Sequence, residues 1–167
     1  QERGRLCLRQ PSQGLAMEAA EAAARVPLEQ RACISCSKDH CGEAPLLSPD
    51  EVAEHMALIC PSWALAADGK SVARSFVAKN FKAAMAAINA YAEVAELPDC
   101  GHHPDMTVRS YRTVDLKLWT HALDGLTVND FIMAAKFDAV KVEYSPKFVR
   151  EHPEMRAGLE ATERAAS

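Results

Sequence analysis

The feature of this sequence that most constrains its fold is a change of hydrophobic period along the middle of the chain. In residues 72–78 one set of alternating positions holds Val72, Arg74, Phe76 and Ala78, and the other holds Ala73 and Val77, which is typical of a β-strand. Residues 80–96 repeat apolar side chains at helical spacing, and residues 114–120 alternate again. A sheet and an amphipathic helix must each cover an apolar face, so this order predicts helices packed against a sheet.

A further helix is predicted to begin just after Ser48. Ser48 is a good N-cap, Pro49 suits the first helical position, and Glu51 completes a capping box. Apolar side chains then recur at helical spacing until Pro61, which ends the run.

Two more strands and a last helix complete the predicted order. Residues 63–67 alternate before the hairpin signal Asp68-Gly69, and residues 108–111 form the other strand. Thr127 is a suitable N-cap for the last helix. The fold class predicted is α+β, in the order α-β-β-α-β-β-α, with a four-stranded antiparallel sheet and helices packed on one face.

Composition narrows the class of protein. A length of 167 residues suits one domain with tails. The net charge of −4 argues against direct nucleic-acid binding, which normally requires a basic surface. No apolar run approaches the roughly 20 residues of a membrane span, so no transmembrane segment is expected.

Three of the six histidines fall within residues 102–121. The unperturbed pKa of imidazole, about 6.5, lets it exchange protons near neutral pH. Such a cluster suggests proton-transfer chemistry or a metal site. For any one of these histidines alone, an ordinary polar loop residue or strand-end cap would be the favoured interpretation, and it is their combination that favours a functional site.

The residues around these histidines resemble the motif of the pterin-4a-carbinolamine dehydratase family. The matching positions are His102, His103, Pro104, Tyr111, His121 and Asp130. The resemblance covers residues 33–142, which leaves residues 1–32 as an N-terminal extension and residues 143–167 as a C-terminal tail. The family has the same α+β layout that the hydrophobic pattern predicts.

The resemblance implies dehydration of a 4a-hydroxytetrahydropterin to a quinonoid dihydropterin, in support of pterin recycling. By matching position, His102 and His121 are the candidates for general acid and base. His103 is the candidate for contact with the pterin near its leaving hydroxyl. The substrate is a small pterin, and neither a metal nor a redox cofactor is implied.

Further substrate-binding candidates surround the histidines. Pro104 would fix the backbone after the histidine pair. Asp130 would orient an imidazole or bind a pterin nitrogen, unless it serves only to cap the last helix. Trp119 would line the pocket or form a surface or interface aromatic.

One position departs from the family pattern. The family usually has an acidic residue four positions before the first histidine, where this chain has Pro98. Either Glu96 reaches the histidines across a longer loop, or Asp99 takes that place, or the support is absent.

The cysteines permit a second interpretation. Cys33 and Cys36, with His40 and Cys41, have the spacing of a zinc half-site. Four ligands within nine residues are cramped, so a structural or incidental role is favoured and zinc is the alternative. The irregular spacing of the cysteines favours mostly reduced thiols in an intracellular compartment.

The alternative function is that of a non-catalytic accessory or assembly subunit of a larger organellar complex. The two extensions and the longer loop before His102 favour it. The family resemblance also implies a homo-oligomer, a dimer or tetramer. Arginines in the first 30 residues favour a mitochondrial or plastid matrix location, with the cytoplasm as the alternative.

Overall fold

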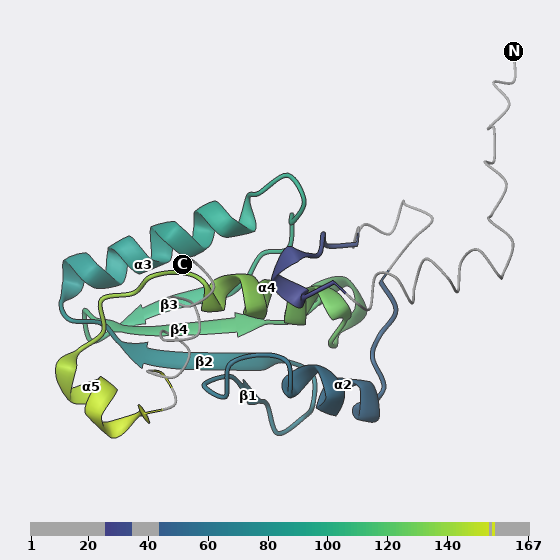
Figure 1. The fold of residues 1–167 in the computed structure, drawn as a ribbon, viewed down its shortest axis with the longest axis horizontal. Coiled ribbons are helices and arrows are strands. Elements are labelled where there is room, and N and C mark those ends of the chain that lie inside the picture. The colour runs from purple at the N-terminus through teal and green to yellow at the C-terminus, as the bar shows by residue number, and fades with distance from the viewer. Residues whose placement is uncertain (1–25, 35–43, 154, 156–167) are drawn as a thin grey trace, which may run out of the picture.

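The computed structural model describes residues 26–34, 44–153 and 155. In chain order its elements are η1 (Leu28–Gln30), α2 (Pro49–Met56), β1 (Ala64–Leu65), β2 (Val72–Val77), α3 (Phe81–Ala95), β3 (Asp105–Arg109), β4 (Thr113–Leu118), η2 (His121–Leu123), α4 (Val128–Asp138) and α5 (Pro146–Glu151) (Figure 1).

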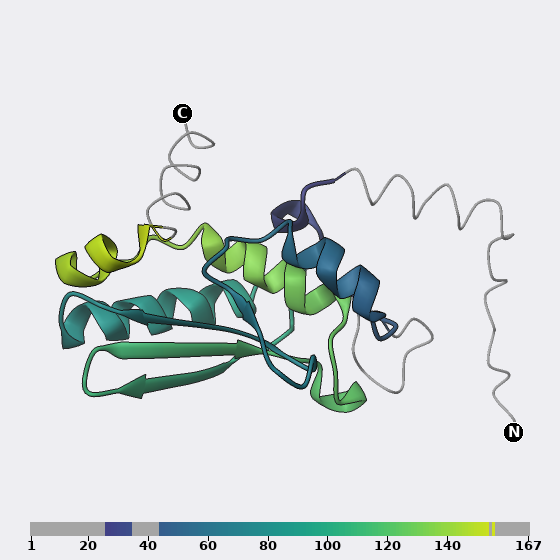
Figure 2. The same ribbon diagram turned by 90° about the horizontal axis from the view of Figure 1, so that it is seen from below.

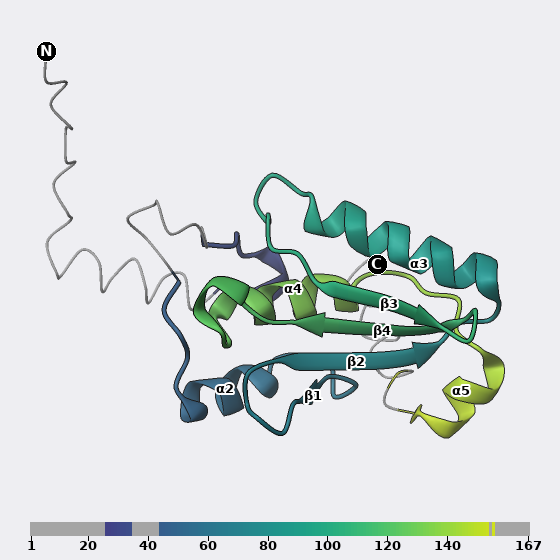
Figure 3. The ribbon, with the colours of Figure 1, turned by 180° about the vertical axis from the view of Figure 1, so that it is seen from behind.

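The four strands form one antiparallel sheet in the order β1-β2-β4-β3. Figure 3 shows the strands in this order, with β3 along one edge. Figure 2 views the sheet nearly edge-on and shows α2, α3 and α4 on the same side of it. This confirms the α+β class, the four-stranded antiparallel sheet and the packing of helices on one face.

Two strand boundaries predicted from the pattern were wrong. The strand predicted at residues 63–67 is only Ala64–Leu65. The strand predicted at residues 108–111 is Asp105–Arg109, because Ser110 and Tyr111 have φ of 46° and 58° and form the left-handed turn to β4. Moving the strand earlier brings Asp105 into the sheet, directly after the histidine pair.

The core lies between the inner face of the sheet and α4. Val72, Phe76 and Leu116 are fully or almost fully buried on the strands. In α4 the residues from Asn129 to Ala135 are all buried. In α3 the small side chains of Ala84 and Ala87 are buried and allow close packing, since they occupy little space between helix and sheet.

A buried charge lies within the apolar row of β2. The guanidinium of Arg74 donates to Asp138 Oδ1 at 2.6 Å and to the Tyr144 hydroxyl at 2.8 Å. The Trp63 indole N–H and the Cys60 backbone N–H donate to the same Asp138 carboxylate. A buried charge is tolerated when it is paired and hydrogen-bonded, so this cluster joins β2, the end of α4 and the chain after it.

The chain after α4 returns along the sheet. Tyr144 bridges to Ala78, and its ring packs edge-on against Phe76 at 5.3 Å between centroids. Phe148 in α5 stacks on His152, and Met155 is buried. Residues 140–153 therefore extend the core beyond the end of β2 (Figure 3).

The described part of the N-terminal segment packs on α4. Leu28 in η1 is buried in the core. The Asn129 side chain accepts from the Ile34 N–H at 2.8 Å and donates to the Ile34 carbonyl at 2.6 Å. Within the described ranges, no helix is both long and apolar enough to cross a membrane.

Candidate active site

The histidines predicted from the sequence lie around the loop that joins α3 to β3. His102 is the buried member, and its Nε2 lies 2.7 Å from Asp130 Oδ1. Gly101 immediately before it has φ of 66°, a left-handed conformation that glycine adopts at little cost. The loop thus turns inward at His102, which ties it to the start of α4.

Asp130 is fully buried and serves two purposes. Its position in the first turn of α4 lets Oδ2 accept from the Thr127 N–H at 2.8 Å, which caps the helix. The Thr120 hydroxyl also donates to Oδ2, at 3.0 Å. The same carboxylate therefore caps α4 and contacts the His102 imidazole, so capping is not its sole role.

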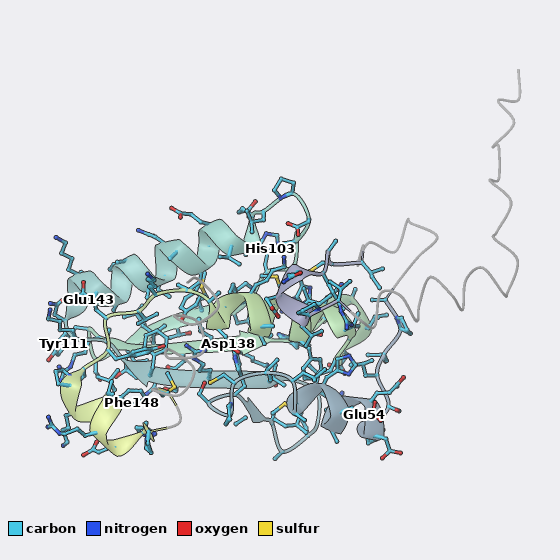
Figure 4. All side chains as sticks on the ribbon, viewed as in Figure 1. Glu54, His103, Tyr111, Asp138, Glu143 and Phe148 are labelled. Carbon is cyan, nitrogen blue, oxygen red and sulfur yellow. The ribbon has the colours of Figure 1, made fainter. Side chains whose placement is uncertain are left out.

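His103 points to the outside, with 62% of its side chain exposed. Its Nε2 lies 2.8 Å from Glu96 Oε1, and Glu96 is the residue at which α3 ends. Asp99 instead accepts from Lys136 Nζ at 3.1 Å. Of the alternatives for the missing acidic residue, the geometry therefore places Glu96 beside the histidines. Figure 4 shows His103 near the end of α3.

His121 is the second exposed imidazole, with 57% of its side chain accessible. It begins η2, and its Nε2 lies 3.7 Å from Asp105 Oδ1. The ring of Trp119 packs edge-on against it, with 4.2 Å between centroids, and the Trp119 indole N–H donates to Asp105 Oδ2 at 3.0 Å. Asp105 thus accepts a hydrogen bond from Trp119 and lies next to His121.

Asp105 is the residue of this site that the sequence pattern missed. It lies two residues after His103, so the same short segment carries one imidazole and contacts the other. The sequence signal that could have found it was an acidic residue directly after the His102-His103-Pro104 run. Pairing of Asp105 with Lys117, two residues before Trp119, brings it to the end of β4.

Tyr111 belongs to the sequence motif but not to this cluster. It lies in the turn between β3 and β4 and is exposed. Figure 4 shows it well apart from His103, at the other end of α3.

The described residues contain no group of three metal-ligating side chains. Cys36, His40 and Cys41 of the candidate zinc half-site lie outside the described ranges, and Cys33 is the one member that is described. The site consists of exposed imidazoles beside carboxylates, an arrangement suited to moving protons.

Comparison with known proteins gives this site a family. The family model for pterin 4 alpha carbinolamine dehydratase matches residues 45–140, which contain all the site residues named above. The chain belongs to this family.

Individual relatives agree with the family assignment. A Halorhodospira halophila protein whose name assigns it to the same family is 37% identical over 113 residues, covering 68% of this chain and 96% of its own. Pterin-4-alpha-carbinolamine dehydratase 2, mitochondrial, from Arabidopsis thaliana is 32% identical over 118 residues, covering 70% of this chain and 60% of its own.

A solved structure also matches the fold. The crystal structure titled transcriptional coactivator/pterin dehydratase from Brucella melitensis superposes with a TM-score of 0.51 at 32% identity. The match covers 57% of this chain and 97% of the Brucella chain, so nearly the whole of that smaller protein corresponds to part of this one.

Proposed function

We propose that this chain dehydrates a 4a-hydroxytetrahydropterin to the quinonoid dihydropterin by histidine general acid and base catalysis, in support of pterin recycling. Family membership supports the reaction type. The observation that carries the mechanism is the pair of exposed imidazoles, each beside a carboxylate: His103 beside Glu96 at the end of α3, and His121 beside Asp105 at the start of β3.

The reaction needs two proton transfers. The bond from C4a to its hydroxyl oxygen breaks as that oxygen gains a proton and leaves as water. The N5–H proton goes to a base as the double bond between N5 and C4a forms. His103 and His121 are assigned to these transfers, each of which typically contributes about 10²–10⁴-fold to a rate.

The remaining residues hold these imidazoles and shape the pocket. Glu96 positions His103, and Asp105 positions His121 and Trp119. The Trp119 ring offers the pterin an aromatic wall, while Pro104 separates His103 from the strand.

His102 and Asp130 form the buried support. Since its imidazole is buried against Asp130, His102 acts in this proposal as a positioning residue that fixes the loop carrying His103. Asp130, with its carboxylate already bonded to His102, Thr120 and Thr127, acts through His102 rather than on the pterin.

The test is a comparison of three alanine variants. Initial rates of 4a-hydroxytetrahydropterin dehydration are measured for wild type, His103→Ala, His121→Ala and the control His55→Ala, whose histidine lies on α2. The first two variants are expected to lose about 10²–10⁴-fold in kcat/KM. His55→Ala is expected to retain the wild-type rate. Equal rates in all four proteins would refute the assigned roles.

A second candidate function is that of an accessory or assembly subunit. The observation that favours it is exposed apolar surface on α3, where Phe81 is 56% and Met85 is 37% exposed. The Brucella structure's title also pairs a coactivator with a dehydratase. A chain found by mass measurement only in a complex with a different protein, and inactive on the pterin, would support this candidate instead.

An organellar location is part of the same proposal. It is supported by the Arabidopsis relative named as mitochondrial. Fractionation of the source cells with an antibody to this chain tests it. Recovery in the mitochondrial or plastid matrix is expected, and recovery in the cytosol alone would contradict it.

A further inference from the structure

Two cysteines from distant parts of the chain meet beside the histidine loop. The Cys33 backbone N–H donates to the Asp99 carbonyl at 2.7 Å, which sets the N-terminal segment alongside the loop between α3 and β3. The thiol of Cys33 is a hydrogen-bond partner of the Cys100 thiol. The backbone bond and the side-chain hydrogen bond together place the two cysteines beside each other, and neither is in a disulfide.

Both backbones at this contact are held in place by other bonds. On one side, the Asn129 side chain bonds to both the N–H and the carbonyl of Ile34, next to Cys33. On the other, Lys136 donates to the Asp99 carboxylate, next to Cys100. Both anchors come from α4, so the helix presents the two thiols to one another.

We propose that Cys33 and Cys100 are a redox site that closes to a reversible disulfide, joining the N-terminal segment to the loop that carries His102 and His103. Both side chains are half-buried, so a small oxidant reaches them from the surface. Disulfide formation requires close partners. The bond from the Cys33 N–H to the carbonyl of Asp99, the residue before Cys100, brings these two cysteines close together.

The step is a thiol–disulfide exchange with a low-molecular-weight disulfide such as oxidised glutathione. One cysteine thiolate attacks a glutathione sulfur and releases one reduced glutathione, giving a mixed disulfide. The second cysteine then attacks the protein sulfur of that mixed disulfide and releases the other reduced glutathione. The protein loses two electrons and two protons, and one oxidised glutathione becomes two reduced molecules.

Oxidation of the two cysteines would restrict the motion of the loop between α3 and β3. It would leave the side chains of His102 and His103 chemically unchanged. Cys100 lies two residues before His102, so a covalent bond at Cys100 restrains the loop where it leaves α3. The segment at residues 26–34 would become fixed to the same point. Local opening of the loop requires the loop to separate from the segment at residues 26–34. The disulfide would therefore suppress this opening.

The full chain is equilibrated with oxidised glutathione, its remaining thiols are alkylated, and it is digested with trypsin without reduction. The expected product links the peptide of residues 32–38 to that of residues 83–109, and fragmentation assigns the bond to Cys33 and Cys100. Reduction with dithiothreitol should return both peptides. Hydrogen exchange in residues 97–103 should slow on oxidation and recover on reduction.

Three serine variants make the assignment specific. Cys33→Ser and Cys100→Ser should each abolish the linked peptide pair. The control Cys60→Ser should leave it unchanged, since Cys60 lies near Asp138 and accepts from the Ser62 hydroxyl. Far-ultraviolet circular dichroism confirms that each variant is folded.

Other products would overturn the proposal. These are a bond from Cys33 to Cys36, stable glutathione adducts on both thiols, or unchanged thiols in the folded wild-type chain. None of these readouts depends on pterin dehydration, so the outcome is independent of the proposed activity.

Discussion

At the scale of single residues, the Asp130 carboxylate links helix formation to the candidate site. It accepts from the first turn of α4 and from Thr120, and it holds His102. Because all of these contacts are buried, loss of the charge leaves donors without an equivalent acceptor. The stability of α4 and the placement of the histidine loop should therefore be affected together.

Asp130→Asn is expected to lower the free energy of unfolding by about 2–4 kcal/mol, since it weakens the buried hydrogen bonds to His102 and Thr120 and the cap of α4. The measurement is urea unfolding followed by circular dichroism. The matched control is Asp124→Asn, because Asp124 pairs with Lys70 at the surface and asparagine tolerates its left-handed backbone. The control should change stability by less than about 0.5 kcal/mol. If both variants lost the same free energy of unfolding, the buried contacts of Asp130 would contribute no more to stability than the surface contact of Asp124.

At the scale of elements, α4 organises the parts of the chain that surround the site. Its first turn binds His102 through Asp130 and the N-terminal segment through Asn129. Lys136 in its last turn holds the loop at Asp99. The short helix of residues 128–138 is thus the common support for two segments that have little regular structure of their own.

Asn129→Ala is expected to release the segment at residues 26–34, because both bonds to Ile34 are lost. Trypsin should then cleave after Arg31 faster than in wild type, and the free energy of unfolding should fall by about 1–3 kcal/mol. Asn89→Ala, an exposed position within α3, is the control and should not destabilise the protein. Unchanged cleavage after Arg31 in Asn129→Ala would contradict this role.

Local sequence patterns predicted most of the elements, because strand alternation, helical spacing and caps are short-range signals. Ser48 and Thr127 do precede helices, and Val72 and Phe76 do lie on one face of β2. Local patterns do not predict contacts between residues that are far apart in the sequence. Examples are Arg74 with Asp138 and Asp105 with His121, which depend on how elements pack. Loop geometry was equally inaccessible, so the choice of Glu96 over Asp99 needed the structure.

At the scale of the whole molecule, two exposed features favour self-association. β3 is an edge strand of the sheet, and an unpaired edge is a ready template for another strand. On α3, Phe81 and Met85 are exposed apolar side chains one helical turn apart. A second copy of the chain would cover both features, in keeping with the expected dimer or tetramer.

Mass measurement by size-exclusion chromatography with light scattering tests this expectation. Wild type is expected to be a dimer or tetramer, and Phe81→Lys with Met85→Lys is expected to shift it to a smaller species that stays folded. Leu58→Lys, another exposed apolar position, is the control and should leave the mass unchanged. A monomeric wild type would disprove the expected homo-oligomer.

Catalysis of pterin dehydration by this chain is tested most directly by comparing the rate of 4a-hydroxytetrahydropterin dehydration in purified wild-type protein with the rate in buffer alone. The substrate is generated in the cuvette and the quinonoid dihydropterin is followed by its absorbance. The expected rate is above that of buffer, is proportional to protein concentration and is lost in the combined His103→Ala and His121→Ala variant. A folded wild-type chain that gives only the buffer rate would contradict it.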